Sequence, residues 1–200
     1  VASDEQRFQV QNQLKAQDVH CDILLEPSSK NTCPAALLAA LHLKNNADNG
    51  YMLILPSDHL IPDVAAFSAA IKTGIPASNK GAIVTLGITP NRPETGYGYL
   101  KIDRSEQGEL LSVEAFHEKP SLEKANLMLS QGDFLWNAGI FLVTPDRLLE
   151  LAALLEPEML EKTKAAFENA VRDGNFVRPN ASLWNQIKGE SIDYAIIEKN

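Results

Sequence analysis

The sequence predicts an α/β fold with a doubly wound, mixed and mainly parallel sheet. Short apolar runs alternate with Ala- and Leu-rich segments of helical length, the order that is typical of βαβ units. The runs at 22–26 and 51–55 are apolar on both faces, which favours parallel strands covered by helices on each side. From 97 to 118 the residues alternate as in half-exposed antiparallel strands, which makes the predicted sheet a mixed one.

The helices between these strands are predicted from their end signals. Pro34 and Pro62 stand at first helical positions, and Thr144-Pro145-Asp146 combines a cap, a proline and an acid in the first turn. Ser121 is a cap whose helix ends before Gly132. The expected helices cover about 34–47, 62–74, 121–131, 157–174 and the segments after 144 and 191. The expected strands are 22–26, 51–55, 81–88, 97–103, 109–118 and 138–143.

Composition indicates a globular domain and excludes several classes of protein. Of 200 residues, 44% are apolar and 22% charged, and we expect residues 1–200 to form a single domain truncated at both ends. The net charge of -8 argues against binding nucleic acid, which requires clustered Lys and Arg. No apolar run reaches the roughly 18 residues of a membrane span. Cys21 and Cys33 are expected to be free thiols in a reducing cytosol.

Polar clusters follow two of the predicted strands, where ligands bind in open α/β sheets. Asp58 comes just after the run at 51–55, and a carboxylate so placed suits Mg²⁺, which takes one or two protein carboxylates plus substrate phosphates. The alternative is a turn former or a helix cap. The loop 26–32 precedes a helix whose exposed N–H groups can bind anions. There the alternative is a plain capping loop, in which Asn31 and Thr32 satisfy those donors.

Three further clusters are candidates. Gly96 and Gly98 flank Tyr97 and would let backbone approach a ligand, although a hairpin turn is the simpler explanation of the two glycines. Glu118 and Lys119 are expected on opposite faces of a continuing strand, and so need not pair with each other. The segment 136–141 leads small and polar residues into a buried strand, or forms a turn with core aromatics.

The sequence contains no motif that prepares a nucleophile. Phosphoryl-type transfer does not need one, because positioning and charge neutralisation carry most of the catalysis. A sugar 1-phosphate has a second pKa of about 6, so it is largely ionised near neutral pH and needs no general base. Scattered Asp, Lys, Gly and Asn residues in loops are what such an enzyme requires.

Taken in order, the clusters resemble the bacterial mannose-1-phosphate guanylyltransferases (GDP-mannose pyrophosphorylases). The similar segments, which span nearly the whole chain, are Glu26–Ala35, Leu55–His59, Pro93–Tyr99, Phe116–Pro120, Trp136–Phe141 and Ser191–Lys199. Each segment is weak alone, but all in sequence are specific. The resemblance implies a Rossmann-like nucleotide-diphospho-sugar transferase fold in a cytoplasmic enzyme of polysaccharide biosynthesis. The implied reaction converts GTP and mannose 1-phosphate into GDP-mannose and pyrophosphate with Mg²⁺, and a homodimer is among the assemblies left open.

By position, the resemblance also implies roles for individual residues. Asp58 would be the metal ligand, and Lys119 would neutralise phosphate charge as the second catalytic residue. The implied nucleotide-binding residues are Glu26, Pro27, Asn31, Thr32 and Ser57. The implied sugar-phosphate-binding residues are Glu94, Gly96, Tyr97, Gly98, Glu118, Asn137, Gly139 and Asp193. The alternative for Asp193 is a first-turn acid that complements a helix dipole.

The sequence also departs from the family. It lacks the Gly-rich, Arg-containing stretch that cradles the triphosphate and the later Trp-x-Asp-x-Gly-x-Trp that supplies a second metal aspartate. Lys30 stands where the family usually has Arg, which keeps the charge but loses the planar fork. The chain alone is therefore expected to bind part of the substrates and to catalyse weakly or not at all. Two alternatives stay open: a sister nucleotidylyltransferase for another base or sugar, and a non-catalytic sugar-nucleotide-binding module.

Overall fold

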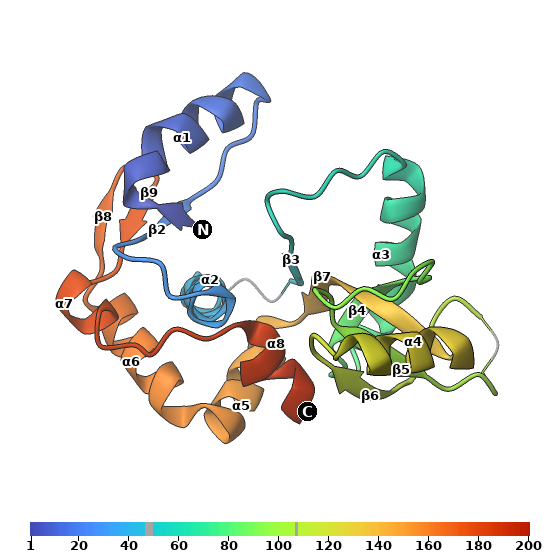
Figure 1. Ribbon diagram of the computed structural model, residues 1–200. Helices are drawn as coiled ribbons and strands as arrows, with labels where there is room; N and C mark the ends of the chain where they lie inside the picture. Colours follow the sequence, from blue (N-terminus) through green and yellow to red (C-terminus); the bar gives the residue numbers. More distant parts are fainter. Residues whose placement is uncertain (47–49, 107) are drawn as a thin grey trace. The chain divides into compact units, whose positions relative to one another are not determined.

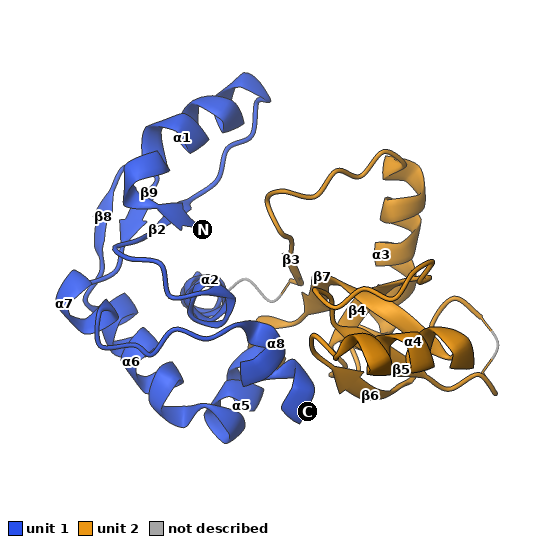
Figure 2. Ribbon diagram, in the orientation of Figure 1, with its two compact units in different colours: residues 1–49, 148–199 blue, residues 50–147, 200 orange. Residues whose placement is uncertain are grey.

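The computed structural model describes residues 1–46, 50–106 and 108–200 (Figure 1). The chain forms two compact units (Figure 2). Unit 1 comprises residues 1–49 and 148–199, and unit 2 comprises residues 50–147 together with Asn200. Each unit has its own sheet.

The sheet of unit 1 has the strand order β1-β2-β9-β8. Strands β1 and β9 run parallel to β2, and β8 is antiparallel to β9. The strands are β1 (Ala2–Ser3), β2 (Ile23–Glu26), β8 (Val171–Asp173) and β9 (Phe176–Arg178). Ile23, Leu25 and Phe176 are buried together, and Val10 and Leu14 of α1 pack against them. The apolar run predicted at 22–26 is therefore a core strand, and the loop that follows β2 is anchored on it.

Helices make up most of the rest of unit 1. They are η1 (Asp4–Gln6), α1 (Arg7–Ala16), α2 (Thr32–Asn45), α5 (Pro145–Leu155, whose first turn belongs to unit 2), α6 (Pro157–Glu168), α7 (Ala181–Trp184), α8 (Ile192–Ala195) and η2 (Ile197–Lys199). The helix predicted at 34–47 is α2, and its predicted end at residue 47 lies outside the described residues. Both cysteines are free, as predicted, and burial raises the pKa of the Cys33 thiol to about 12. Over the described residues, no helix has the length and apolar character needed to span a bilayer.

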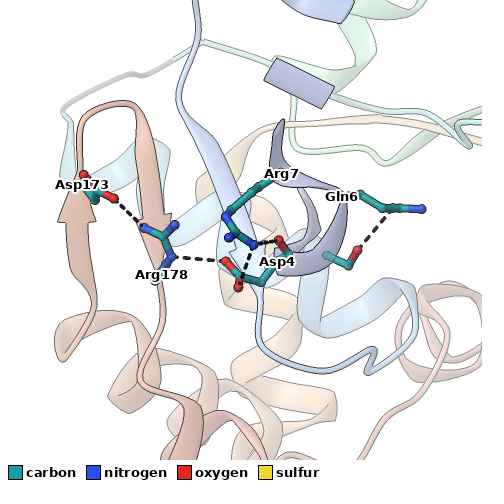
Figure 3. A network of polar contacts seen from close by, with 6 residues as sticks. Asp4, Gln6, Arg7, Asp173 and Arg178 are labelled. Atoms are coloured by element: carbon teal, nitrogen blue, oxygen red, sulfur yellow. Dashed lines mark hydrogen bonds and ion pairs between the residues drawn. The ribbon is translucent and has the colours of Figure 1, made fainter. Parts of the chain in front are cut away.

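A polar network ties the start of unit 1 to its β8–β9 hairpin (Figure 3). The Arg178 Nε atom lies 3.2 Å from Asp4 Oδ1, and its NH1 atom lies 3.3 Å from Asp173 Oδ2. Arg7 NH1 lies 3.3 Å from the second Asp4 oxygen. Because these side chains are partly exposed, each pair contributes only about 0–1 kcal/mol. The network therefore orients the N-terminal segment more than it stabilises the unit.

The sheet of unit 2 is antiparallel in every pairing recorded among the described residues. Its strands are β3 (Met52–Ile54), β4 (Val84–Ile88), β5 (Tyr99–Ile102), β6 (Val113–His117) and β7 (Phe134–Val143). Strand β7 pairs with β3, β4 and β5, and β6 adds to β5. The prediction of a mainly parallel, doubly wound sheet is thus wrong for this unit. A short apolar run does not fix strand direction, and Leu53 and Leu55 are 36% and 47% exposed, not buried on both faces.

Two of the described helices accompany the sheet of unit 2. Helix α4 (Leu122–Gln131) has the predicted ends, with the Ser121 hydroxyl accepting from the Lys124 N–H and with Gly132 in the left-handed conformation. The other helix, α3 (Val64–Ser78), continues past its predicted end at Gly74. Gly74 is buried, and a Cβ atom there would lie 2.9 Å from Val84 Cγ1. This glycine therefore permits close packing on β4 and does not end the helix.

The helix predicted at 157–174 also differs from the structure. Helix α6 ends at Glu168, and residues 171–178 form the β8–β9 hairpin. Gly174 has a φ of 60° in the turn between these strands. Its positive φ serves a hairpin turn, whereas the sequence pattern predicts a helix end at the same glycine.

Candidate functional site

Gly98, directly before β5, is the centre of the candidate residues in unit 2. Its carbonyl oxygen accepts a 2.8 Å hydrogen bond from the Asn137 N–H, and the neighbouring Tyr97 carbonyl accepts one of 3.2 Å from the Lys119 N–H. A Cβ atom on Gly98 would lie 2.6 Å from Glu118 Oε2. A larger residue at 98 would require these groups to shift, and the structure brings the five residues into one cluster.

Glu118 and Lys119 form an ion pair, contrary to the prediction that they face opposite ways. The Lys119 Nζ atom lies 2.7 Å from Glu118 Oε1. Strand β6 already ends at His117, and Lys119 has a φ of 46°, so the alternation of a strand no longer applies. The Glu118 side chain is only 9% exposed while that of Lys119 is 55% exposed. The pair thus sets a nearly buried carboxylate beside an accessible ammonium group.

Glu94 organises the loop that leads to Gly98. Its Oε1 atom accepts hydrogen bonds from the N–H groups of Thr95 and Gly96 at 3.1 and 3.2 Å, and Arg92 lies 3.2 Å from Oε2. These contacts, the Gly96 N–H first among them, hold the pKa of the Glu94 carboxyl below its ordinary value. Tyr99 closes the loop because its hydroxyl accepts from the Glu94 N–H and donates to the Glu94 carbonyl, each at 2.9 Å. Glu94 therefore fixes the loop's shape.

Arg92 and Trp136 are two residues of this cluster that the predicted site lacks. The Arg92 guanidinium carbon lies 5.2 Å from the centre of the Trp136 ring, and Tyr97 meets the same ring edge-on at 5.3 Å. The Trp136 Nε1 atom is buried, and no described residue accepts its hydrogen bond. In the sequence, Arg92 stands immediately before Pro93-Glu94, which does not reveal a role for it. Its stacking on the Trp136 ring, which Tyr97 also contacts, shows that it helps to hold Tyr97 and the loop that leads to Gly98.

Asn137 and Gly139 lie on β7 next to the chain segment that carries Asp58. The Asn137 Oδ1 atom accepts from the Gly139 N–H at 3.1 Å and from the Thr85 hydroxyl at 2.8 Å. Gly139 has a φ of 66°, and a Cβ atom there would lie 3.7 Å from Pro56 Cγ. Ser57 and Asp58 follow Pro56 in an exposed turn after β3. This places the Asp58 turn close to Gly139.

The residues of this site suit a metal ion that is coordinated partly by the protein and partly by a bound nucleotide. They do not suit a metal ion that is coordinated by protein side chains alone. Within the described part of the chain, no three His, Cys, Asp or Glu side chains gather closely enough to hold a metal ion. Mg²⁺ is often bound by one or two carboxylates and completed by substrate phosphates and water. The exposed carboxylate of Asp58 fits such an ion, with the remaining ligands coming from a nucleotide.

In unit 1, the loop between β2 and α2 lines a shallow hollow of about 490 Å³. Its lining residues are Ser29, Lys30, Asn31 and Gly189. A Cβ atom on Gly189 would lie 2.9 Å from the Lys30 carbonyl oxygen, so this glycine allows the two segments to pass closely. The Lys30 Nζ atom donates to the Asn185 carbonyl at 3.0 Å, which directs its charge toward unit 1's own backbone.

Glu26 ends β2 and starts this loop with a half-buried carboxyl group. Its Oε1 atom is buried, and no residue in the described ranges gives it a hydrogen bond. Burial raises the pKa of Glu26 above its ordinary value, against a smaller opposing effect of the Lys30 backbone N–H. A buried acceptor without a donor carries a free-energy cost of roughly 1–3 kcal/mol, which a ligand with N–H groups can remove.

The N–H groups at the start of α2 are already satisfied, so the capping alternative describes them. Asn31 Oδ1 accepts from the Thr32 N–H at 2.9 Å, and the Cys33 N–H donates to the Glu190 carbonyl at 3.1 Å. Pro34 has no N–H. The Thr32 hydroxyl accepts from the Ile192 N–H at 2.9 Å and thereby ties α8 to this loop. The expected row of free anion-binding donors is therefore not found.

The predicted site residues divide between the two units. Unit 1 contains Glu26, Pro27, Asn31, Thr32 and Asp193, and unit 2 contains Ser57, Asp58, Glu94, Gly96, Tyr97, Gly98, Glu118, Lys119, Asn137 and Gly139. Ser57 thus lies in a different unit from the other predicted nucleotide ligands, and Asp193 in a different unit from the other predicted sugar ligands. Asp193 is half-buried in the first turn of α8, the position that its alternative interpretation describes.

Curated relatives match the whole chain. Identity is 40% to the xanthan biosynthesis protein XanB of Xanthomonas campestris pv. campestris, 36% to the mannose-1-phosphate guanylyltransferase of Escherichia coli K12 and 38% to the alginate biosynthesis protein AlgA of Pseudomonas aeruginosa. The chain spans only 42%, 43% and 42% of the lengths of these relatives. The predicted resemblance to mannose-1-phosphate guanylyltransferases is therefore confirmed. It extends over less than half of the length of each of these relatives.

Two solved structures have a similar fold over 99% of the chain. A Helicobacter pylori protein described as a mannose-6-phosphate isomerase matches with a TM-score of 0.89 and 29% identity, over 77% of its own chain. A Thermus thermophilus protein described as a mannose-1-phosphate geranyltransferase matches with a TM-score of 0.84 and 29% identity, over 55% of its chain. The profile of the family described as Nucleotidyl transferase matches residues 1–189. Because this match covers nearly all of the 200 residues, the chain belongs to the nucleotidyl transferase family.

Proposed function

We propose that the protein is a mannose-1-phosphate guanylyltransferase, which forms GDP-mannose and pyrophosphate from GTP and mannose 1-phosphate. Its relatives support this reaction, since one of them, 36% identical over the whole chain, has that name. The structural observation that carries the guanine assignment is the buried Oε1 atom of Glu26. The family match extends across both units, which supports assigning residues 1–189 to one nucleotidyltransferase domain.

Glu26 suits guanine because of the donors that this base presents. Guanine carries its N1–H and its 2-amino group side by side, and a carboxylate can accept from both. Adenine and the pyrimidines do not offer this pair. A site built around a buried acceptor rejects a base that lacks the matching donors, because the acceptor then stays without a partner. In this proposal Pro27 and the hollow beside Asn31 hold the rest of the nucleotide.

The cluster around Gly98 suits a hexose phosphate. The carboxylate of Glu118 is an acceptor for sugar hydroxyl groups, and the half-exposed ammonium of Lys119 offers positive charge to a phosphate. Glycine at 98 leaves backbone and carboxylate close together where a larger side chain would displace them. The amide of Asn137 adds hydrogen-bonding capacity at the same place.

The reaction needs positioning and charge neutralisation and no base. A phosphate oxygen of mannose 1-phosphate attacks the α-phosphorus of GTP, the bond from this phosphorus to the bridging oxygen of the β-phosphate breaks, and pyrophosphate leaves. The attacking phosphate is already mostly dianionic near neutral pH, since its second pKa is about 6. Lys119 would hold this phosphate by charge. Asp58 would hold a Mg²⁺ ion shared with the nucleotide phosphates, whose chemistry is to neutralise the negative charge that develops in the transfer.

The direct test is turnover by the complete protein, measured as GDP-mannose and pyrophosphate. GTP with mannose 1-phosphate is compared with UTP, dTTP and ATP and with glucose 1-phosphate. The proposal expects the GTP and mannose 1-phosphate pair to be preferred and the Glu26→Gln variant to lose preference for GTP. Activity with only another pair would indicate a sister nucleotidylyltransferase. Binding of GDP-mannose without any turnover would indicate a non-catalytic module.

A further inference from the structure

Trp184 joins the end of α7 to the loop that follows β2. Its indole N–H donates a 2.8 Å hydrogen bond to the carbonyl oxygen of Ser28, two residues after Glu26. The Trp184 side chain is fully buried, and its N–H is the one polar group of the indole ring. The ring and the loop backbone therefore hold one another in a fixed relation.

Helix α7 is itself anchored away from this loop. The Asn180 side chain caps α7 by accepting from the Leu183 N–H at 3.1 Å, and the Asn180 N–H donates to the Ala166 carbonyl at 2.9 Å. Ala166 is a fully buried residue of α6. Trp184 therefore fixes the middle of the loop relative to the core of unit 1.

Asn185, the next residue, makes two further contacts with the same part of the loop. Its side-chain oxygen accepts from the Ser28 hydroxyl at 2.7 Å, and its carbonyl oxygen accepts from the Lys30 ammonium at 3.0 Å. The hydrogen bonds at the α2 end of the loop are separate, since they join residues 32–33 to residues 190–192. The stretch from Ser28 to Lys30 is therefore held by the end of α7.

We propose that Trp184 is a positioning residue for the nucleotide, which holds the loop after β2 in the shape that binds the base before the nucleotide arrives. This inference rests on the proposed function, because it takes Glu26 and the hollow beside Lys30 as parts of the nucleotide site. The loop and Glu26 are linked, since the Lys30 backbone N–H interacts with the Glu26 carboxyl group. A loop that is ordered in advance loses less conformational entropy when the ligand binds, so the ligand binds more tightly.

The test replaces Trp184 by phenylalanine, which keeps an aromatic ring but removes the N–H. In the complete protein, Trp184→Phe should raise KM for GTP by about three- to tenfold, the loss expected for one hydrogen bond. KM for mannose 1-phosphate should stay within about twofold of the wild type, because the proposed hexose contacts belong to unit 2. Thr163→Val is the matched control, since it removes a buried hydroxyl whose hydrogen bond to the Met159 carbonyl does not involve the loop. An equal rise of both KM values, or the same rise in the control, would show a merely structural role and overturn the inference.

Calorimetric titration with GDP measures the same effect without catalysis. The dissociation constant of GDP should rise about three- to tenfold in Trp184→Phe and remain at the wild-type value in Thr163→Val. If Trp184→Phe does not fold, Asn185→Ala replaces an exposed side chain, removes the acceptor of the Ser28 hydroxyl and should weaken GDP binding in the same direction. An unchanged GDP dissociation constant in the folded variant would overturn the inference, whereas a wild type that binds no GDP would refute the proposed function.

Discussion

A Cβ atom on Gly98 would lie 2.6 Å from the carboxylate oxygen of Glu118 and 2.8 Å from Phe116 Cζ. Both distances are shorter than non-bonded atoms approach, and Glu118 is only 9% exposed and held by Lys119. The glycine is therefore required by the packing of its neighbours, independently of any ligand. It also makes the position of Glu118 sensitive to a single methyl group.

Gly98→Ala should destabilise the protein by about 1–3 kcal/mol, because overpacking forces side chains out of their preferred positions. Thermal or urea unfolding of the chain measures this loss. Gly96→Ala is the matched control, since a Cβ atom there meets only Glu94 Oε1 at 3.6 Å, an ordinary contact. Equal stability of the two variants would mean that Glu118 and Phe116 move aside freely.

Glu26→Gln should make the folded chain more stable at pH 7. Burial raises the pKa of Glu26, so the folded state keeps its proton to a higher pH than the unfolded chain does. The free energy of unfolding therefore falls as pH rises from the ordinary pKa of a glutamate to this raised value. The Gln side chain does not titrate, and the variant's advantage over the wild type should shrink as pH falls to about 4 and below, because Glu26 then becomes protonated in both states. Urea unfolding at the two pH values measures the difference.

Glu158→Gln provides a control of opposite sign. The hydrogen bond from Lys162 holds the pKa of Glu158 below its ordinary value, so this group stabilises the fold at neutral pH and ceases to do so as pH falls through its folded pKa. Its replacement should give no gain at pH 7.

A Glu26→Gln variant less stable than the wild type at pH 7 would show that the buried oxygen has a partner.

Thr32→Val should cost about 1 kcal/mol of stability, because the hydroxyl that accepts from the Ile192 N–H caps the first turn of α8. Thr32→Ser retains the oxygen and should keep most of that stability. Urea unfolding of the three proteins measures the difference. A valine variant as stable as the wild type would remove the capping role and leave ligand binding as the reason for this residue.

Asp58→Asn should lower turnover of the complete enzyme by about 100-fold or more, the size of loss typical when one electrostatic contact to a transition state is removed. Added Mg²⁺ should recover part of the rate, since the weakened site then fills at higher concentration. Stability should change by less than about 0.5 kcal/mol because Asp58 is exposed. Wild-type turnover at low Mg²⁺ would exclude Asp58 as a metal ligand.

Asp63→Asn is the matched control for Asp58→Asn. Asp63 is a nearby exposed acid whose Oδ1 atom caps α3 by accepting from the Ala66 N–H at 2.8 Å. Asparagine caps a helix as well as aspartate does, so the control loses a negative charge without losing its structural role. A similar loss of turnover in both variants would point to a general electrostatic effect.

Local signals in the sequence predicted some elements closely. Helix α4 begins after Ser121 and ends before Gly132 as predicted, because caps act through the backbone of their own helix. The same local reasoning was wrong at Gly74 and Gly174. One of these glycines serves the packing of α3 on Val84 and the other a hairpin turn. The role of Gly74 depends on a contact that the neighbouring sequence does not show, whereas Asp173-Gly174 is itself a local signal for a hairpin turn.

Strand direction and the finer contacts of the candidate site required the structure. An apolar run such as 51–55 is compatible with either direction, and its pairing with β7 made it antiparallel. Gly98, Glu118 and Asn137 come together because each lies at the end of a strand or within a strand of one sheet, which the separate motifs do not state. The motifs also did not predict the stacking of Arg92 on Trp136, since that contact joins side chains far apart in the sequence.

The most direct test of the proposed function maps the two ligands separately on the nitrogen-15-labelled chain. Addition of GDP should shift the backbone signals of Glu26, Lys30 and Gly189 in unit 1. Addition of mannose 1-phosphate should shift those of Gly98, Glu118 and Asn137 in unit 2. Mannose 1-phosphate that shifts none of these three signals at saturating concentration, or GDP that acts only on residues outside the β2–α2 loop, would contradict the proposal.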